Sequence, residues 1–392
     1  MNRIYLDHAA TTPVKPEVLD AMMPYFTQSF GNPSSIYQVA QINKKAIDDA
    51  RETIAKHLGA NTNEIFFTSG GTEADNWAIK GIVEANKNKG NHIITTKIEH
   101  HAVLHTCEYL EKQGFEVTYL DVNEEGVIDL EALKAAIKDT TILISIMYAN
   151  NEVGTIMPIK EIGAIAKEHG IAFHTDAVQA IGQVRIDVKE QNIDALSLSG
   201  HKIYGPKGIG VLYIRRGLRI TNLIHGGAQE RGRRAGTENV PAIVGIAKAM
   251  ELAYTDFEAK NERIKDLRDK LMNGILESIP YSKLNGSSTN RLVNNVNIGF
   301  EFVEGESLLL LLDMNGVAAS SGSACTSGSL DPSHVLLALG LPHEKAHGSL
   351  RLTLGEGTTE QEVDYVLEKL PAIVQRMRDM SPLYEEFMKN NQ

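Results

Sequence analysis

Cysteine is scarce in this chain, with only Cys107 and Cys325 among 392 residues. Two cysteines do not make a disulfide framework of the kind that stabilises small secreted domains. Long apolar runs are absent as well, because the longest one, Leu308 to Leu312, is far too short to cross a bilayer. The first residues, Met1 to His8, contain no apolar core of a signal peptide. We therefore expect a cytoplasmic protein with reduced thiols and no membrane contact.

Positive charge is also in deficit, since 39 Lys and Arg residues stand against 50 Asp and Glu residues and the net charge is −11. Nucleic-acid recognition usually requires a basic face, so we expect no direct nucleic-acid binding, although Arg231 to Arg234 leaves a local basic patch open. The hydrophobic content of 42% is sufficient for a large core. The length predicts roughly two or three domains.

Short β-rich runs alternate with helical stretches between about residues 60 and 215. The candidate strands span residues 64–68, 92–95, 115–120, 141–146, 171–174, 195–198 and 210–214. Apolar strands separated by helices are typical of a mostly parallel sheet that helices cover on both faces. Ligands bind at the carboxyl ends of the strands in such sheets. The residues that follow each strand are therefore the first candidates for a functional site.

The C-terminal part differs in texture. A long helical stretch from about Pro241 to Leu276 precedes a strand at 292–298, an apolar helix around 308–312, a strand at 349–354 and an amphipathic final helix. We interpret this part as a second, smaller α+β domain. The expected division is a large α/β domain at residues 15–255 and a small domain formed by residues 1–14 and 256–392.

Small residues surround Cys325, which lies in the run Ser320-Ser321-Gly322-Ser323-Ala324-Cys325-Thr326-Ser327-Gly328-Ser329. Such a run offers little apolar area to bury and loses much backbone entropy when ordered. We expect a mobile loop at about residues 320–332 with an exposed, nucleophilic thiol. Cys107, in contrast, falls within an expected helix.

A glycine turn follows the first of the candidate strands, in Thr68-Ser69-Gly70-Gly71-Thr72-Glu73. Backbone N–H groups at the start of the next helix, together with the Thr72 hydroxyl, would bind a phosphate. A plain turn with a Thr N-cap has the same letters.

Two later strands also end in polar groups. Asp176 follows the strand at 171–174, where it either has a cationic or hydrogen-bonded role or caps a helix. Lys202 follows the strand at 195–198, beside Ser199 and His201, where it is either an amine nucleophile or an ordinary solvated lysine.

Together these groups are what pyridoxal 5'-phosphate (PLP) requires. The lysine binds the cofactor covalently, the aspartate keeps the pyridine nitrogen protonated, and the hydroxyls bind the phosphate. His100 or His101, after the strand at 92–95, would stack on the flat ring, unless it is a surface residue at a helix start.

The order of these motifs resembles the cysteine desulfurases of the NifS/IscS type, which are class V aminotransferases with the PLP-dependent fold of aspartate aminotransferase. The resemblance covers nearly the whole chain. It is carried by Tyr5-Leu6-Asp7-His8-Ala9-Ala10-Thr11-Thr12, Gly31-Asn32-Pro33-Ser34-Ser35, Ser69-Gly70-Gly71-Thr72-Glu73, Glu99-His100-His101, Asn150-Asn151-Glu152-Val153-Gly154, Asp176-Ala177-Val178-Gln179, Ser199-Gly200-His201-Lys202 and Ser321-Gly322-Ser323-Ala324-Cys325. It implies an α/β fold with a mostly parallel seven-stranded sheet in the large domain.

The resemblance also implies a role for each matching residue. Lys202 would bind PLP, Asp176 would pair with its ring nitrogen, and His100 would stack on the ring. The remaining cofactor contacts would come from Gly71, Thr72, Asn151, Gln179, Ser199, His201 and, from the partner of a homodimer, Thr237. Asn32 and Arg351 would bind the substrate carboxylate. No metal is expected.

The implied reaction converts L-cysteine to L-alanine and places the sulfur on Cys325 as a persulfide, with His100 as candidate acid/base. The acceptor would be an iron–sulfur scaffold or another sulfur-accepting protein. Three alternatives stay open at this point: an aminotransferase of the same fold, a selenocysteine lyase, and a non-catalytic scaffold that binds iron–sulfur assembly proteins.

Overall fold

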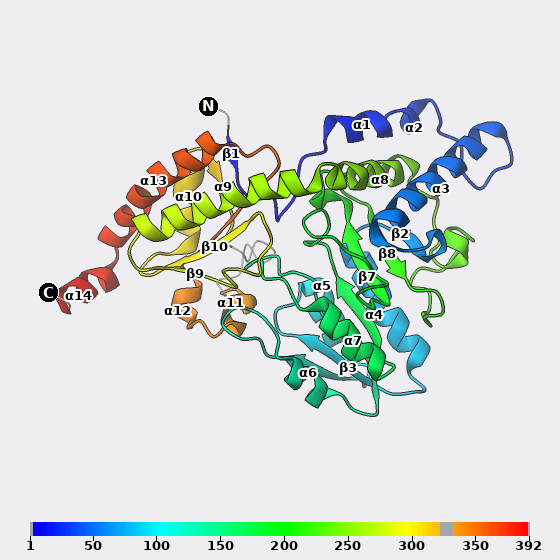
Figure 1. Ribbon diagram of the computed structural model, residues 1–392, viewed down its shortest axis with the longest axis horizontal. Coiled ribbons are helices and arrows are strands. Elements are labelled where there is room, and N and C mark those ends of the chain that lie inside the picture. Colours follow the sequence, from blue (N-terminus) through cyan, green and yellow to red (C-terminus); the bar gives the residue numbers. More distant parts are fainter. Residues whose placement is uncertain (1–2, 322–331, 391–392) are drawn as a thin grey trace.

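The computed structural model describes residues 3–321 and 332–390. Its largest element is a seven-stranded sheet with the order β2-β8-β7-β6-β5-β3-β4 (Figure 1). The strands are β2 (Ile65–Thr68), β3 (His92–Thr96), β4 (Glu116–Leu120), β5 (Thr141–Ser145), β6 (Ala172–Asp176), β7 (Ala195–Ser199) and β8 (Gly210–Ile214). From β4 across to β7 all pairs are parallel, and β8 runs antiparallel to both of its neighbours. The prediction of an α/β fold with a mostly parallel seven-stranded sheet is confirmed.

Helices cover both faces of this sheet because the strands are apolar on both sides. Phe66 packs in one core with α4 (Gly71–Asn86) and α5 (His101–Glu111), whereas its neighbour Phe67 packs in the core on the opposite face. The opposite face is covered by α1 (Pro16–Met22), α3 (Gln38–Leu58), α7 (Ile159–Glu168) and α8 (Val240–Tyr254). Cys107 lies on α5, as expected of a helix, and is fully buried.

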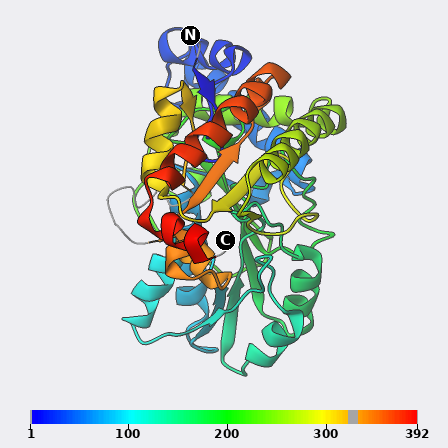
Figure 2. The same cartoon turned by 90° about the vertical axis from the view of Figure 1, so that its left-hand side faces the viewer.

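A second core surrounds an antiparallel sheet with the order β12-β10-β9. Its strands are β9 (Ser282–Leu284), β10 (Asn295–Phe300) and β12 (Ser349–Thr353), and its helices are α9 (Phe257–Ser278), α10 (Gly305–Met314) and α13 (Glu360–Asp379). In Figure 1 this sheet and α13 lie on the left, and in Figure 2, which views the molecule from that side, they lie in front. The N-terminal β1 (Ile4–Tyr5) pairs with β11 (Val317–Ala318).

The other elements are short or lie at the surface. They are α2 (Pro24–Thr27), α6 (Leu130–Ala136), α11 (His334–Ala338), α12 (His343–Ala346) and α14 (Pro382–Asn390), with the 3-10 turns η1 (Thr62–Glu64), η2 (Gly200–Lys202) and η3 (Glu230–Gly232). No helix in the described ranges is both long and apolar enough to cross a membrane.

Two elements differ in detail from the sequence predictions. The helical stretch expected from about Pro241 to Leu276 consists of two helices, α8 and α9, because Thr255 is extended and Asp256 has a left-handed backbone with φ +48°. Aspartate tolerates that conformation better than most residues, so no glycine or proline marks the break. The strand expected at 292–298 starts only at Asn295, after a turn.

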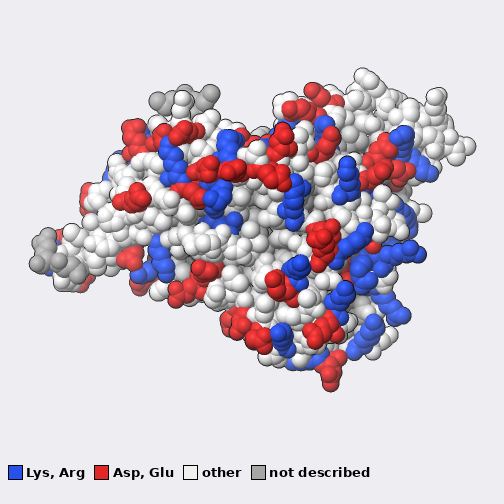
Figure 3. All heavy atoms as spheres, in the orientation of Figure 1, with Lys and Arg blue, Asp and Glu red and all other residues white. Residues whose placement is uncertain are grey.

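Acidic and basic side chains are interspersed over much of the face in Figure 3, with a gathering of Lys and Arg at its right-hand edge. The basic stretch at 231–234 makes contacts within the fold. Arg234 pairs with Glu73 at the start of α4, and the guanidinium groups of Arg231 and Arg233 lie over the ring of Phe66.

Candidate active site

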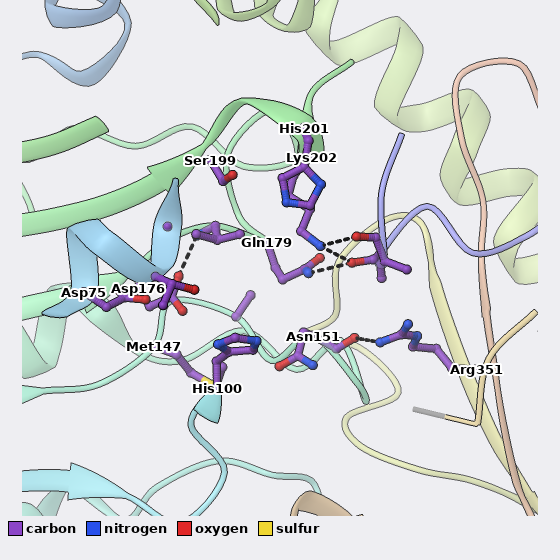
Figure 4. Close-up of a pocket in the computed structure, with 16 residues that line it drawn as sticks. Asp75, His100, Met147, Asn151, Asp176, Gln179, Ser199, His201, Lys202 and Arg351 are labelled. Carbon is purple, nitrogen blue, oxygen red and sulfur yellow. Dashed lines mark hydrogen bonds between the residues drawn. The ribbon is translucent and has the colours of Figure 1, made fainter. Parts of the chain in front are cut away.

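A cavity of about 350 Å³ lies at the carboxyl ends of the central strands. Within the described ranges, every residue that the sequence predicts for the site lines it, except Asn32 and Thr237. The remaining lining comes from Ala9, Ala10, Asp75, Met147, Ala149 and Val178. The second sheet also contributes, through Arg351 on β12, so the cavity lies between the two cores (Figure 4).

The N-terminus of α4 forms one wall. Gly71 packs so closely against the turn after β6 that an added Cβ would lie 2.7 Å from Val178 Cγ2. Glu73 secures this turn, since it accepts hydrogen bonds from the backbone N–H of Ser69 and from the guanidinium of Arg234. Burial opposes ionisation of Glu73, but these hydrogen bonds outweigh it and lower its pKa. The first turn of α4 thus stays fixed with its N–H groups at the cavity.

Asp176 closes β6 and is buried. Its Oδ1 accepts a hydrogen bond from Val178 N at 2.9 Å, and a turn rather than a helix follows, so Asp176 is not a helix N-cap. Burial raises the pKa of Asp176 to about 6, while the positive charge of Lys202 acts in the opposite direction. A carboxylate at this place is ionised at neutral pH and faces the cavity.

Lys202 ends η2, directly after β7. Its Nζ lies inside the cavity and donates hydrogen bonds to the carbonyl oxygens of Ala9 and Ala10 (Figure 4). It is therefore not a solvated surface lysine. The neighbouring His201 bonds to Thr11 Oγ1 through Nδ1 at 3.1 Å, and burial, with a smaller effect of Lys202, lowers its pKa to about 4.

His100 is the N-cap of α5, and its Nδ1 accepts a hydrogen bond from Ala102 N at 3.1 Å. Burial first, and then the charges of Lys202 and His334, lower the pKa of His100 to about 4. The ring is therefore neutral at pH 7, and because Nδ1 is the acceptor, its proton is on Nε2. His101 does not line the cavity; its ring stacks on that of His105, with centroids 4.9 Å apart.

Arg351 is fixed from two sides. Its Nη1 donates to the backbone oxygen of Asn151 and its Nη2 to Asp7 Oδ1, both at 2.9 Å. The side chain is only 3% exposed, and its buried Nε has no hydrogen-bond partner in the described residues. Gln179 lies nearby and donates from Nε2 to Ala9 O at 3.1 Å.

Two predicted site residues lie away from the cavity, and a third is not among the residues that the structure describes. Asn32 is exposed and accepts a hydrogen bond from Ser34 N, and Thr237 is also exposed. Neither lines the cavity of this chain. Cys325 and most of its expected loop lie outside the described residues.

Sequence reasoning missed Asp7 and Asp75. Asp7 belongs to the first motif of the resemblance, but nothing local signals its pairing with a residue 344 positions away. Asp75 lies inside a helix, and the sequence alone predicts that an aspartate there is exposed to solvent.

The cavity fits PLP by its set of donors and acceptors. The start of α4, with Thr72, and the neighbouring Ser199 and His201 suit a phosphate. The Asp176 carboxylate suits a protonated ring nitrogen, and the amine of Lys202 suits the cofactor's aldehyde carbon. Gly71 and Gln179 complete the lining of this part of the cavity.

Comparisons with known proteins give the family. The sequence-family model of the class V aminotransferases matches residues 4–366 of this chain. A protein named "Cysteine desulfurase IscS" from Clostridium botulinum is 62% identical over 395 residues and covers 100% of both chains. Another of that name, from Methanosarcina thermophila, is 64% identical over 380 residues, which are 97% of this chain and 94% of its own.

Solved structures agree with the sequence relatives. A structure described as a NifS-like protein superimposes with a TM-score of 0.90 at 40% identity, over 95% of this chain and 99% of its own. "SspA in complex with cysteine" has a TM-score of 0.81 at 42% identity, over 91% of this chain and 100% of its own. This chain therefore belongs to the PLP-dependent class V aminotransferase family, as a cysteine desulfurase of the NifS/IscS type.

Proposed function

We propose that this protein converts L-cysteine to L-alanine and passes the sulfur, through a persulfide on Cys325, to acceptor proteins for iron–sulfur cluster assembly or other thiolation. The observation that carries the proposal is the position of Lys202 Nζ in a cavity that also contains Asp176 and Arg351. Its relatives named "Cysteine desulfurase IscS" and the neighbour solved with cysteine support the choice of substrate.

PLP, when bound, supplies an electron-poor ring that accepts the electron pair of the substrate's Cα–H bond. Lys202 would hold the cofactor through its Nζ, and the same amine, when free, would remove the Cα proton of the substrate. Asp176, ionised at neutral pH, holds the proton of the ring nitrogen. Thr72, Ser199 and His201 would hold the phosphate, and His100 would stack on the ring.

The guanidinium of Arg351 binds the substrate carboxylate. Two of its N–H groups are engaged by Asn151 O and Asp7, which leaves others for a carboxylate in the cavity. A guanidinium suits that task because its parallel donors match the two oxygens.

Cys325 accepts the sulfur. Its thiolate forms an S–S bond with the substrate sulfur while the substrate's Cβ–S bond breaks, and the electron pair of that bond stays on carbon. Protons then complete the three-carbon product as alanine. The thiol must first lose its proton, and neutral His100 is the candidate base.

We further propose a homodimer in which Thr237 of one chain completes the phosphate site of the other. Thr237 is exposed, and large apolar side chains on and between α2 and α3 are exposed too: Phe26 is 54%, Phe30 72% and Ile36 94% accessible. Exposed large apolar side chains are typical of a protein interface.

The proposed domains, 15–255 and 1–14 with 256–392, meet at the break between α8 and α9. A reactive thiol of this kind suits the reducing cytoplasm.

The test is amino-acid analysis and sulfide assay with L-cysteine as the only substrate. We expect alanine without any added keto acid, which an aminotransferase would require. Cys325→Ala should keep the yellow bound cofactor and lose sulfide release, whereas the control Cys107→Ala should keep both. Turnover of cysteine by Cys325→Ala at the wild-type rate would overturn the sulfur-carrier role. Activity of that variant on selenocysteine alone would favour a selenocysteine lyase.

A further inference from the structure

Asp75 is a buried carboxyl group in the floor of the cavity. It lies on α4, is 1% exposed, and lines the cavity. Its Oδ1 has no hydrogen-bond partner in residues 3–321 and 332–390. A buried carboxylate oxygen without a hydrogen-bond partner is costly, so this position calls for a physical explanation.

The side chains around Asp75 and the adjacent His174 come from three strands of the seven-stranded sheet. His174 and Asp176 are two residues apart on β6, so their side chains share the face that α4 covers. Figure 4 shows the side chains of Asp75 and Asp176 next to each other. Ser145 on β5 and Ser197 on β7 bond to the two ring nitrogens of His174, at 2.9 Å and 3.0 Å.

Among the described side chains that contact Asp75 none carries a positive charge, and Lys202, in the same cavity, acts on Asp176. Within the described ranges, Asp75 is paired with one basic side chain, His174. The Nε2 atom of His174 lies 3.6 Å from Asp75 Oδ1. Burial lowers the pKa of His174 to about 3, so its ring is neutral. The titratable groups whose charges act on Asp75 are themselves buried acids, Asp176 first and then Glu99.

Two adjacent carboxyl groups in a dry site do not both ionise easily. Burial, the charge of Asp176 and, less strongly, that of Glu99 raise the pKa of Asp75 well above its usual value, although Ser197 opposes the shift. The pKa of Asp176 rises only to about 6, with Lys202 acting against the rise. The hydrogen bonds agree with this order, because Asp176 Oδ1 accepts from Val178 N at 2.9 Å whereas Asp75 Oδ1 has no partner in the described residues. The surroundings therefore favour the proton on Asp75 and the charge on Asp176.

We propose that Asp75 is a positioning residue that stays a neutral carboxylic acid at pH 7, so that Asp176 is left as the one carboxylate of this pair to face the cofactor ring. As the neutral acid it adds a hydrogen-bond donor to the floor and no second negative charge. The inference rests on the proposed use of Asp176 toward the ring nitrogen.

Infrared spectroscopy tests this directly on the protein without and with PLP. At pH 7 the wild type should show the C=O band of a protonated carboxylic acid that Asp75→Asn lacks. Glu99→Gln is the matched control, because it removes a different buried acid and its band can be subtracted. Absence of any protonated-acid band that depends on Asp75 would overturn the proposal.

Cofactor affinity gives a second readout. Asp75→Asn resembles the neutral acid and should bind PLP within about twofold of wild type, whereas Asp75→Ala loses the donor and should bind about tenfold more weakly. A loss of tenfold or more in Asp75→Asn would overturn the neutral state, and that variant keeps the test valid if Asp75→Ala fails to fold. Wild-type protein that shows the infrared band of Asp75 but has no desulfurase activity would count against the proposed reaction and not against this inference.

Discussion

Asp7 Oδ1 accepts a hydrogen bond from Arg351 Nη2 at 2.9 Å, and this ion pair joins the N-terminal segment to β12 across 344 positions of sequence. Both side chains are mostly buried, at 18% and 3% exposed. The same guanidinium donates to the backbone of Asn151, so the direction in which it faces the cavity is fixed before a substrate arrives.

Asp7→Asn should therefore weaken substrate binding more than chemistry. The neutral amide orients the guanidinium less firmly, so we expect KM for cysteine to rise about tenfold while kcat stays within about twofold. Asp313→Asn is the matched control, because it removes an exposed ion pair with Arg3. A fall in kcat at unchanged KM would contradict the positioning role of Asp7.

Lys202→Ala should lose the covalent attachment of PLP. Borohydride, which fixes a lysine-bound cofactor to the protein, should leave no label on the variant, whereas wild type and Lys207→Ala should be labelled. Mass spectrometry of the digested protein locates the label. A label on Lys207 in the Lys202→Ala protein would show that the lysine assignment is wrong.

The two cysteines should differ sharply in reactivity. Burial raises the pKa of Cys107 far above its usual range, and the residue is fully buried on α5. We expect iodoacetamide to modify native wild-type protein once, at Cys325, and native Cys325→Ala not at all, with Cys107 reacting only after unfolding. Rapid modification of Cys107 in the folded variant would contradict this burial.

Gly71→Ala should weaken binding of PLP, because the added Cβ would lie 2.7 Å from Val178 Cγ2 and push the start of α4 away from the turn that holds Asp176. We expect the affinity of the apoprotein for PLP, measured by fluorescence titration, to fall by about tenfold or more. Gly357→Ala is the control, since its Cβ would meet nothing within 4 Å. Equal affinities in the two variants would argue against this site for the phosphate.

Glu99 should make stability depend on pH. Burial raises its pKa to about 8, so the folded state binds a proton that the unfolded state releases between about pH 4.5 and pH 8. Stability from this group is present at low pH and lost as pH rises through the folded pKa. Relative to wild type, Glu99→Gln should gain stability over that range, by on the order of 1.4 kcal/mol per pKa unit at most. Thermal unfolding of both proteins at pH 5 and pH 8.5 measures it, and a difference that does not grow with pH would count against the shift.

Much of the site followed from local sequence. Asp176 and Lys202 each come directly after an apolar strand, and parallel strands bring their carboxyl ends to one edge of a sheet, so their meeting in one cavity was predictable. Whether a segment is a helix or a strand was also predictable, because that depends on the period at which apolar residues recur along the sequence. The break at Asp256 was not, because its left-handed backbone carries no glycine or proline signal.

The sequence by itself determined the seven strands, the polar residues at their ends and hence the chemistry of the cavity. Only the tertiary structure decided that Asp7 holds Arg351, and that Asp75 lies beside Asp176 and 3.6 Å from the neutral ring of His174. The physical reason is that a side chain's burial and its long-range partners depend on how helices and sheets pack. An aspartate on a helix reads the same in sequence whether it faces water or a cofactor.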